Sequence, residues 1–343
     1  MQTIHWKINK QQSNNLIYQK AAELLQNGEC VAFPTETVYG LGADATNQAA
    51  IQKIYAAKGR PSDNPLIVHI AKREQMDQFI ASYPPKALQL MEAFWPGPLT
   101  VILPLKKDSL AANVSAGLST VGVRMPEHPV SLELIATANI PIAAPSANRS
   151  GKPSPTTAEH VIEDLDGEIA GIIDGGPTGV GLESTVIDCS LDVPIILRPG
   201  GITIEQIEQV IGTVDLSTNS TTEKPKAPGM KYTHYAPKAP VYLVEGSSQF
   251  WQSEINKVEI AGKKLGILAT KELTSKLATS AVIQSTGSIK AMGEIATSLY
   301  KGLRAFDHAD VDIIFAEVYP ETELGAAIMN RLEKAAGNRR ISE

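Results

Sequence analysis

The richest concentration of small polar groups in the sequence is PTETVYGLG, residues 34–42. It directly follows Cys30–Phe33, an apolar run typical of a short buried strand. Thr35, Glu36 and Thr37 would therefore place two hydroxyls and a carboxylate at a strand end, where open α/β sheets gather their ligands. The alternative is an ordinary tight turn that leads into a helix. Because so many small polar groups occur together, we favour a binding role for this segment.

Two cations flank a glycine in Lys58-Gly59-Arg60, at the predicted end of a helix that is capped by Asn47. An arginine pairs with two phosphate oxygens through its planar fork, whereas a lysine acts as a point charge. The pair could therefore bind a phosphate. It could equally be two solvated cations at a helix C-terminus, which contribute only ~0.3–1 kcal/mol. These three residues alone do not decide between the two interpretations.

A third polar run, AAPSANRSGKPSP at residues 143–155, follows another predicted strand and contains no acidic residue. Its hydroxyls, amides and backbone N–H groups could surround phosphate oxygens or a sugar. A turn-rich connection is the alternative, and the lack of acidic residues favours an anion site. The polar side chains of the run are Ser146, Asn148, Arg149, Ser150, Lys152 and Ser154.

Separate residues complete the set of candidates. Arg124 ends the run VGVR, Ser184 precedes a predicted strand, and Arg198 stands before Pro-Gly-Gly. Taken singly, each arginine is more typical of a surface salt bridge than of a ligand site. The segment GMKYTHYAP, residues 229–237, could close over a nucleotide, or it could be a linker anchored by buried tyrosines. Its candidates are Lys231, Tyr232, His234 and Tyr235.

The elements that would position these groups alternate along the first 212 residues. Apolar runs predict strands at 30–33, 65–70, 99–105, 121–125, 140–144, 169–174, 185–189 and 195–198. Helical spacing predicts helices at 16–25, 47–58 and 202–211, and one or two helices within 76–95, split at Pro84-Pro85. So many strands with few long helices favour one large, twisted, mixed sheet with helices packed on it.

The chain changes character at residues 216–229, which are polar, hold two prolines and lack periodicity, as is typical of a linker or loop. Strands are predicted beyond it at 241–245, 265–269, 282–284 and 313–318, with helices that include 289–306 and 325–336. This alternation favours a small parallel, Rossmann-like α/β domain. We therefore predict a first domain over residues 1–212, a linker or active-site lid over 213–238, and a small domain over 239–343.

Composition narrows the functional classes. A chain of 343 residues is expected to form two domains. The formal net charge of −6 argues against the broad basic surface that binds nucleic acid, so the local clusters of cations point to a small anionic ligand. The two cysteines, Cys30 and Cys189, are too few for a metal cluster and fit a reducing compartment. No apolar run approaches the ~20 residues that span a bilayer, and the N-terminus does not resemble a signal peptide. We expect a cytoplasmic protein with no membrane partner.

Together, the motifs resemble those of the YrdC-type L-threonylcarbamoyladenylate (threonylcarbamoyl-AMP) synthases. The resemblance is carried by PTETVYGLG, KGR followed by NPLIVH, VGVRMP, APSAN and LRPG. The later GMKYTHYAP, followed by a small α/β domain, is similar to the long, two-domain form of that family. The similarity runs in order over nearly the whole chain, with no departure at these positions. It implies a YrdC-like first domain.

The resemblance also implies a role for each candidate. Lys58 and Arg60 would be catalytic. L-threonine would be held by Thr37, His69, Arg124, the backbone of Ala144, and Ser184. ATP would be held by Arg60, Asn64, Thr120, Ser146, Asn148, Ser154, Arg198 and Tyr235. No protein side chain is expected to bind a metal, because Mg²⁺ would arrive on the ATP phosphates.

The activity implied is the conversion of L-threonine, bicarbonate or CO2, and ATP into threonylcarbamoyl-AMP and pyrophosphate. The product would pass to a tRNA threonylcarbamoyltransferase complex that forms N6-threonylcarbamoyladenosine. We expect a monomer or weak dimer with at most weak tRNA binding. One alternative is a carbamoyl-adenylate-forming enzyme, although two cysteines cannot build the zinc modules of those proteins. Another is a non-catalytic module that binds double-stranded RNA or tRNA, against which the acidic composition argues.

Overall fold

The computed structural model describes residues 2–9, 11–217 and 235–343. They form two compact units. The first holds the described residues up to Ser150, from Pro155 to Gly179, and from Glu183 to residue 217. The second holds Gly151–Ser154, Val180–Leu182 and the described residues from Tyr235 to Glu343. Within the described ranges, no helix is long and apolar enough to cross a membrane.

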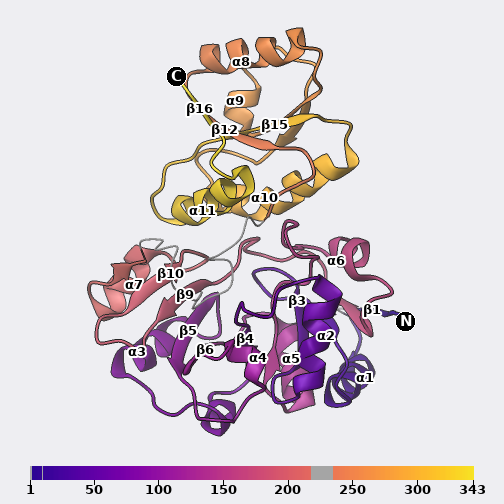
Figure 1. Ribbon diagram of the computed structural model, residues 1–343, viewed down its shortest axis with the longest axis vertical. Coiled ribbons are helices and arrows are strands. Elements are labelled where there is room, and N and C mark those ends of the chain that lie inside the picture. Colours follow the sequence, from indigo (N-terminus) through magenta and orange to yellow (C-terminus); the bar gives the residue numbers. More distant parts are fainter. Residues whose placement is uncertain (1, 10, 218–234) are drawn as a thin grey trace. The chain divides into compact units, whose positions relative to one another are not determined.

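The first unit is built on a mixed sheet of eleven strands, drawn in indigo to pink in Figure 1. Across the sheet, the strands are β1 (Ile4–Lys7), β8 (Gly171–Asp174), β2 (Val31–Phe33), β3 (Gly40–Asp44), β7 (Ile142–Ala143), β4 (Ile67–His69), β6 (Thr120–Arg124), β5 (Leu99–Pro104), β9 (Thr185–Asp188), β10 (Ile195–Arg198) and β11 (Asp215–Leu216). Parallel and antiparallel neighbours both occur, because β4 runs parallel to β6 whereas β5 runs antiparallel to it. The predicted large mixed sheet is confirmed.

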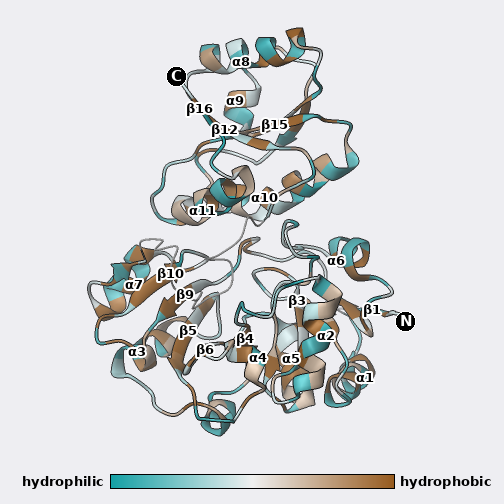
Figure 2. Ribbon diagram, viewed as in Figure 1, coloured by the Kyte–Doolittle hydropathy of each residue, from teal (hydrophilic) through white to brown (hydrophobic). Residues whose placement is uncertain are grey.

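Helices pack on this sheet through their apolar sides. They are α1 (Asn15–Gln26), α2 (Gln48–Lys58), α3 (Pro85–Phe94), α4 (Ala112–Ser115), α5 (Pro129–Ala138), α6 (Ala158–Leu165) and α7 (Ile204–Ile211), with a 3-10 turn η1 (Arg73–Gln78). In Figure 2, α1 and α7 each show a hydrophilic and a hydrophobic side. The largest core cluster joins side chains of α2, α3, α6 and α7 to the sheet, and a second cluster joins α1 and α5 to β2 and β7.

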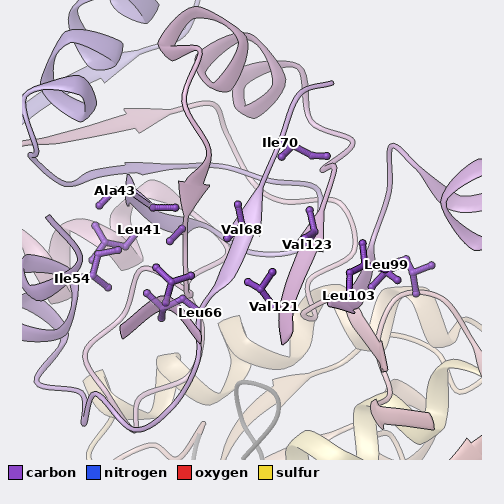
Figure 3. Close-up of a cluster of buried hydrophobic side chains, with 14 of the residues drawn as sticks. Leu41, Ala43, Ile54, Leu66, Val68, Ile70, Leu99, Leu103, Val121 and Val123 are labelled. Atoms are coloured by element: carbon purple, nitrogen blue, oxygen red, sulfur yellow. The ribbon is translucent and has the colours of Figure 1, made fainter. Parts of the chain in front are cut away.

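Residues of the central strands alternate between two faces of the sheet. Leu99, Leu103, Val68, Val121 and Val123 all point into the largest core cluster (Figure 3). Because successive side chains of a strand point to opposite faces, the residues between them must lie on the other face. The polar residues of the central strands occupy those alternate positions.

Helix α2 begins and ends as its sequence predicts. The Asn47 side chain accepts hydrogen bonds from the amides of Ala49 and Ala50 and so caps the first turn. The helix ends at Gly59, whose φ of 60° is the left-handed conformation that glycine adopts most readily. The Arg60 amide then donates to Tyr55 O at 3.0 Å, which closes the end of the helix. Lys58 and Arg60 therefore lie on either side of a fixed turn.

The second unit contains a five-stranded parallel sheet, drawn in orange and yellow in Figure 1. Its order is β14 (Val282–Ser285), β13 (Leu265–Ala269), β15 (Ile313–Glu317), β12 (Val241–Glu245) and β16 (Arg340–Ser342). Helices α8 (Ser248–Ile260) and α9 (Lys271–Thr274) cover one face, and α10 (Met292–Ala305) and α11 (Leu324–Ala336) the other, with a 3-10 turn η2 (Phe306–His308) after α10. The predicted small parallel domain is confirmed.

Four strands differ from the prediction. β3 follows PTETVY where the alternative interpretation placed a helix, and β1, β11 and β16 were not predicted. Each depends on pairing with another strand: Ala43 of β3, for example, pairs with Ala143 of β7, a hundred residues away in the sequence. The predicted boundaries of the linker, 213 and 238, stay predictions. Most of it, residues 218–234 with Lys231, Tyr232 and His234, lies outside the described residues.

Candidate functional site

Predicted threonine ligands share one face of the large sheet. His69 lies opposite Arg124 in the β4–β6 register, and both alternate with valines that point into the core. Thr100 of β5 lies on this same face, because a side-chain carbon added at Gly122 would lie 3.1 Å from its methyl group. Thr120, a predicted ATP ligand, belongs to the same alternate positions of β6. His69, Thr100, Thr120 and Arg124 therefore lie on one face of the sheet, whereas the sequence predicted only that ligands gather at strand ends.

Arg124, the last residue of β6, is buried on this face, and only 4% of it is exposed. Its Nη1 donates to Thr37 Oγ1 at 2.9 Å, and its Nε donates to Gly97 O at 3.3 Å. Its Nη2 lies 2.6 Å from Oε1 of Glu36, which forms a buried ion pair. The interpretation of Arg124 as a surface salt-bridge residue is therefore wrong, because the fold surrounds it.

Neighbouring polar atoms in this region lack hydrogen-bond partners. Within the part of the chain that the structure describes, neither Glu36 carboxylate oxygen has one, and neither does Arg124 Nη2. The Glu36–Arg124 contact is close but is not aligned as a hydrogen bond. Because buried polar groups are almost always paired in folded proteins, two adjacent charged groups left in this state mark a candidate ligand site.

His69 lies beside Arg124 as a neutral imidazole. Burial, and then the guanidinium of Arg124, lower the pKa of His69 from 6.5 to about 3. Its Nδ1 lies 3.2 Å from Ile67 O. If that nitrogen donates to the carbonyl, the other ring nitrogen becomes a neutral acceptor, which can bind a ligand hydroxyl.

Ser184 and Arg198 meet at the adjacent strands β9 and β10. Arg198 Nη2 donates to Ser184 O at 2.9 Å and to Ser184 Oγ at 3.2 Å. The hydroxyls of Ser184 and Thr100 are 2.7 Å apart. Arg198 is only 4% exposed, so it is not a surface residue either. Sequence reasoning gave no role to Thr100, although the alternation in LTVILP could have placed its hydroxyl opposite the core residues.

Lys58 joins the end of α2 to the loop after β7. Its ammonium group is 2.5 Å from Ser146 O and 2.6 Å from Asn148 O, and the lysine is 3% exposed. The Ser146 hydroxyl donates to Asn148 Oδ1 at 2.5 Å. Lys58 is therefore not a solvated cation, and its charge orders this loop. A bridge between Gly40 and Ser146 joins the loop to the start of β3.

Arg60 contacts the segment that leads into β4. Its Nη2 donates to Asn64 O at 3.3 Å and to Pro65 O at 3.2 Å. The Ala144 amide donates to Ile67 O at 2.9 Å, so the backbone group of Ala144 that can accept a ligand hydrogen is its carbonyl. Lys58 therefore contacts the loop after β7 that holds Ser146 and Asn148, while Arg60, on the other side of the Gly59 turn, contacts the segment before β4.

Two predicted ATP ligands belong to the second unit. Ser154 is buried in the segment Gly151–Ser154. The ring of Tyr235 lies 5.3 Å from that of Tyr300 and 5.9 Å from Arg331 Cζ. This packing is what a linker anchored by buried tyrosines predicts. The roles of Ser154 and Tyr235 in binding ATP stay predictions.

In chemical terms, the first unit offers two kinds of environment. One holds Arg124, Glu36, Thr37, neutral His69 and Ser184, which suit a small molecule that carries both charges and a hydroxyl. The other holds Lys58 and Arg60 beside a loop of hydroxyls and amides, which suits phosphate oxygens. Among the described residues, no group of three or more His, Cys, Asp or Glu side chains could hold a metal ion.

Comparison with known proteins decides the family. The model described as "Telomere recombination" (Sua5_yciO_yrdC) matches residues 23–200, and that of the threonylcarbamoyl-AMP synthase C-terminal domain matches residues 202–337. Threonylcarbamoyl-AMP synthase of Bacillus subtilis is 56% identical over 324 residues, which cover 94% of this chain and 93% of that protein. This chain belongs to the threonylcarbamoyl-AMP synthase family.

Other relatives agree with this assignment. Threonylcarbamoyl-AMP synthase of Pyrococcus abyssi is 47% identical over 328 residues, which cover 94% of each chain. The crystal structure of P. abyssi Sua5 complexed with L-threonine matches with a TM-score of 0.93 at 44% identity, over 100% of both chains. The predicted family and its two-part fold are confirmed. The threonylcarbamoyl-AMP synthases are nucleotidyltransferases, so this chain is an enzyme.

Proposed function

We propose that this enzyme joins L-threonine, bicarbonate or CO2, and ATP to give threonylcarbamoyl-AMP and pyrophosphate. The observation that carries the proposal is the buried set of Arg124, Glu36, Thr37 and His69, in which carboxylate and guanidinium atoms lack hydrogen-bond partners among the described residues. A buried guanidinium with spare donors suits the carboxylate of an amino acid. The family assignment supports threonine as that amino acid.

In the proposed binding mode, the threonine carboxylate lies on Arg124, and its hydroxyl lies within reach of His69 or Thr37. Ser184 and the Ala144 carbonyl complete the site. For ATP, the ligands that we propose are Arg60, Asn64, Thr120, Ser146, Asn148, Ser154, Arg198 and Tyr235.

The proposed chemistry needs no protein nucleophile. The threonine ammonium group first loses a proton to solvent, and the neutral amine bonds to the carbon of CO2 with loss of a second proton, or to that of bicarbonate with loss of water, to give an N-carboxylate. One oxygen of that group attacks the α-phosphorus of ATP, and the bond to pyrophosphate breaks. The attack brings an anion to a polyanion, so the protein must align the two and neutralise charge. Lys58, Arg60 and Arg198 supply that charge, and Lys58 also holds the loop of Ser146 and Asn148. Mg²⁺ bound to ATP neutralises further phosphate charge, with no protein side chain proposed as its ligand.

We propose that the product is used by a tRNA threonylcarbamoyltransferase complex in forming N6-threonylcarbamoyladenosine. The enzyme would work in the cytoplasm as a monomer or weak dimer and would bind tRNA weakly if at all. The net charge of −6 supports small-molecule substrates over a nucleic acid surface.

The test is pyrophosphate release from ATP, measured with each substrate omitted in turn. We expect release to require both L-threonine and bicarbonate and not RNA. Arg60→Ala should reduce turnover by at least about tenfold, because the residue is proposed to stabilise developing phosphate charge. Arg73→Ala, an exposed arginine at the start of η1, is the matched control and should leave turnover unchanged. Release that depends on carbamoyl phosphate, or binding of RNA without release, would contradict the proposal.

A further inference from the structure

Glu36 is a buried carboxylate that the proposed reaction does not yet use. It is 8% exposed, and neither of its oxygens has a hydrogen-bond partner within the described ranges. A carboxylate in this state has lost water without gaining donors, which is costly unless a ligand supplies them. The ion pair with Arg124 compensates its charge but leaves its acceptor positions unfilled.

The position of Glu36 determines which ligand group it can take. Arg124 lies 2.6 Å away and is the proposed partner of the substrate carboxylate. Glu36 brings the net charge of the pair to zero, which disfavours a polyphosphate at this point. The zwitterion of an α-amino acid, in contrast, offers an anion for Arg124 and a cation for Glu36, both attached to the same α-carbon.

We propose that Glu36 binds the ammonium group of the amino-acid substrate, so that Arg124 and Glu36 together recognise both charges of a zwitterion. This inference rests on the proposed function, because it assigns a partner to the amine of the same substrate. Glu36 then determines specificity: it selects α-amino acids over hydroxy acids of the same shape. It also holds the nitrogen at a fixed point before that nitrogen is carboxylated.

The test compares two ligands that differ only in the amine. L-threonine and the 2,3-dihydroxybutanoate of matching configuration are titrated into the full-length enzyme by calorimetry, without ATP. We expect the wild type to bind threonine about 10–100-fold more tightly, as a hydrogen-bonded charge implies. Glu36→Gln should reduce that preference to about threefold or less, mainly by weakening threonine binding. Glu36→Asp keeps the charge and should retain a clear preference for threonine.

The ratio within one protein separates recognition from damage to the fold. A variant that merely disturbs Arg124 would lose both ligands equally, and that result would overturn the inference, as would equal binding of both ligands by the wild type. If Glu36→Gln does not fold, Glu36→Ala replaces it in the same comparison of the two ligands and should likewise lose the preference. A wild type that shows the preference but releases no pyrophosphate would refute the proposed reaction only. An active wild type whose preference survives in Glu36→Gln would refute the role of Glu36 only.

Discussion

Replacing Lys58 with methionine is expected to destabilise the first unit by loosening the loop of residues 144–150, which follows β7. Methionine keeps an unbranched apolar chain that is one atom shorter, and it removes the ammonium group. The lysine ammonium group lies 2.5 Å from Ser146 O and 2.6 Å from Asn148 O, and it is buried. Without it, both carbonyls lose a charged donor.

The magnitude follows from these two contacts. A hydrogen bond to a charged group contributes about 1.5–3 kcal/mol, so the pair contributes about 3–6 kcal/mol. Removing a buried ammonium group also removes its desolvation cost, which offsets part of the loss. We expect the free energy of unfolding to fall by about 2–4 kcal/mol, which corresponds to a decrease in Tm of roughly 5–12 °C.

Calorimetry of the full chain gives the Tm, and amide hydrogen exchange gives the local effect. Exchange should accelerate at Ala147 and Ser150, whose amides donate to Tyr39 O and Lys58 O. The matched control is Lys53→Met on the same helix. Lys53 pairs with Glu29 at 2.7 Å but is 45% exposed, so its loss should cost at most about 1 kcal/mol.

The reasoning would be refuted if Lys58→Met and Lys53→Met had the same Tm. It would also be refuted if Lys58→Met unfolded early while exchange at Ala147 and Ser150 stayed at the wild-type rate. In the first case the ammonium group would not order the loop. In the second, the loss of stability would come from elsewhere.

Two further changes probe the polar face of the large sheet. Thr100→Val removes the 2.7 Å contact with the Ser184 hydroxyl. We expect the free energy of unfolding in urea to fall by about 1–2 kcal/mol, and the KM for threonine to rise several-fold. An unchanged KM would argue against Thr100 as a positioning residue. Burial of His69 makes stability depend on pH, because its pKa is lowered to about 3 in the folded protein. Near pH 6.5 the unfolded chain gains a proton at this residue that the folded protein does not gain. Acidification therefore lowers the free energy of unfolding between about pH 6.5 and 3, by about 1.4 kcal/mol per pH unit. His69→Gln should remove about 2 kcal/mol of the loss between about pH 7 and 5 in urea titrations, and an identical pH profile would show that His69 titrates normally.

The features of the fold that the sequence predicts correctly depend on signals between residues close together in the chain. The cap at Asn47 and the end at Gly59 are signals within a few residues, so the bounds of α2 follow from the sequence. The start of α3 at Pro85 is likewise local, since proline favours the first turn of a helix. β3, in contrast, has the sequence GLGAD and little intrinsic strand preference. It is a strand because β2 and β7 pair with it on both sides.

The site could be predicted as residues but not as contacts. The motifs identified Thr37 and Arg124 separately, yet their 2.9 Å hydrogen bond joins positions 87 residues apart. Arg124 and Arg198 look like surface residues when taken singly, because burial depends on the whole fold. Glu36 stands in the first motif, but only the structure gives it a guanidinium partner and unfilled acceptor positions.

The most direct test of the account is a crystal structure of this enzyme with L-threonine bound. The account predicts threonine on the polar face of the large sheet, with its carboxylate on Arg124, its ammonium group at Glu36 and its hydroxyl near His69 or Thr37. Threonine bound away from Arg124, or bound there with its ammonium group directed away from Glu36, would contradict it.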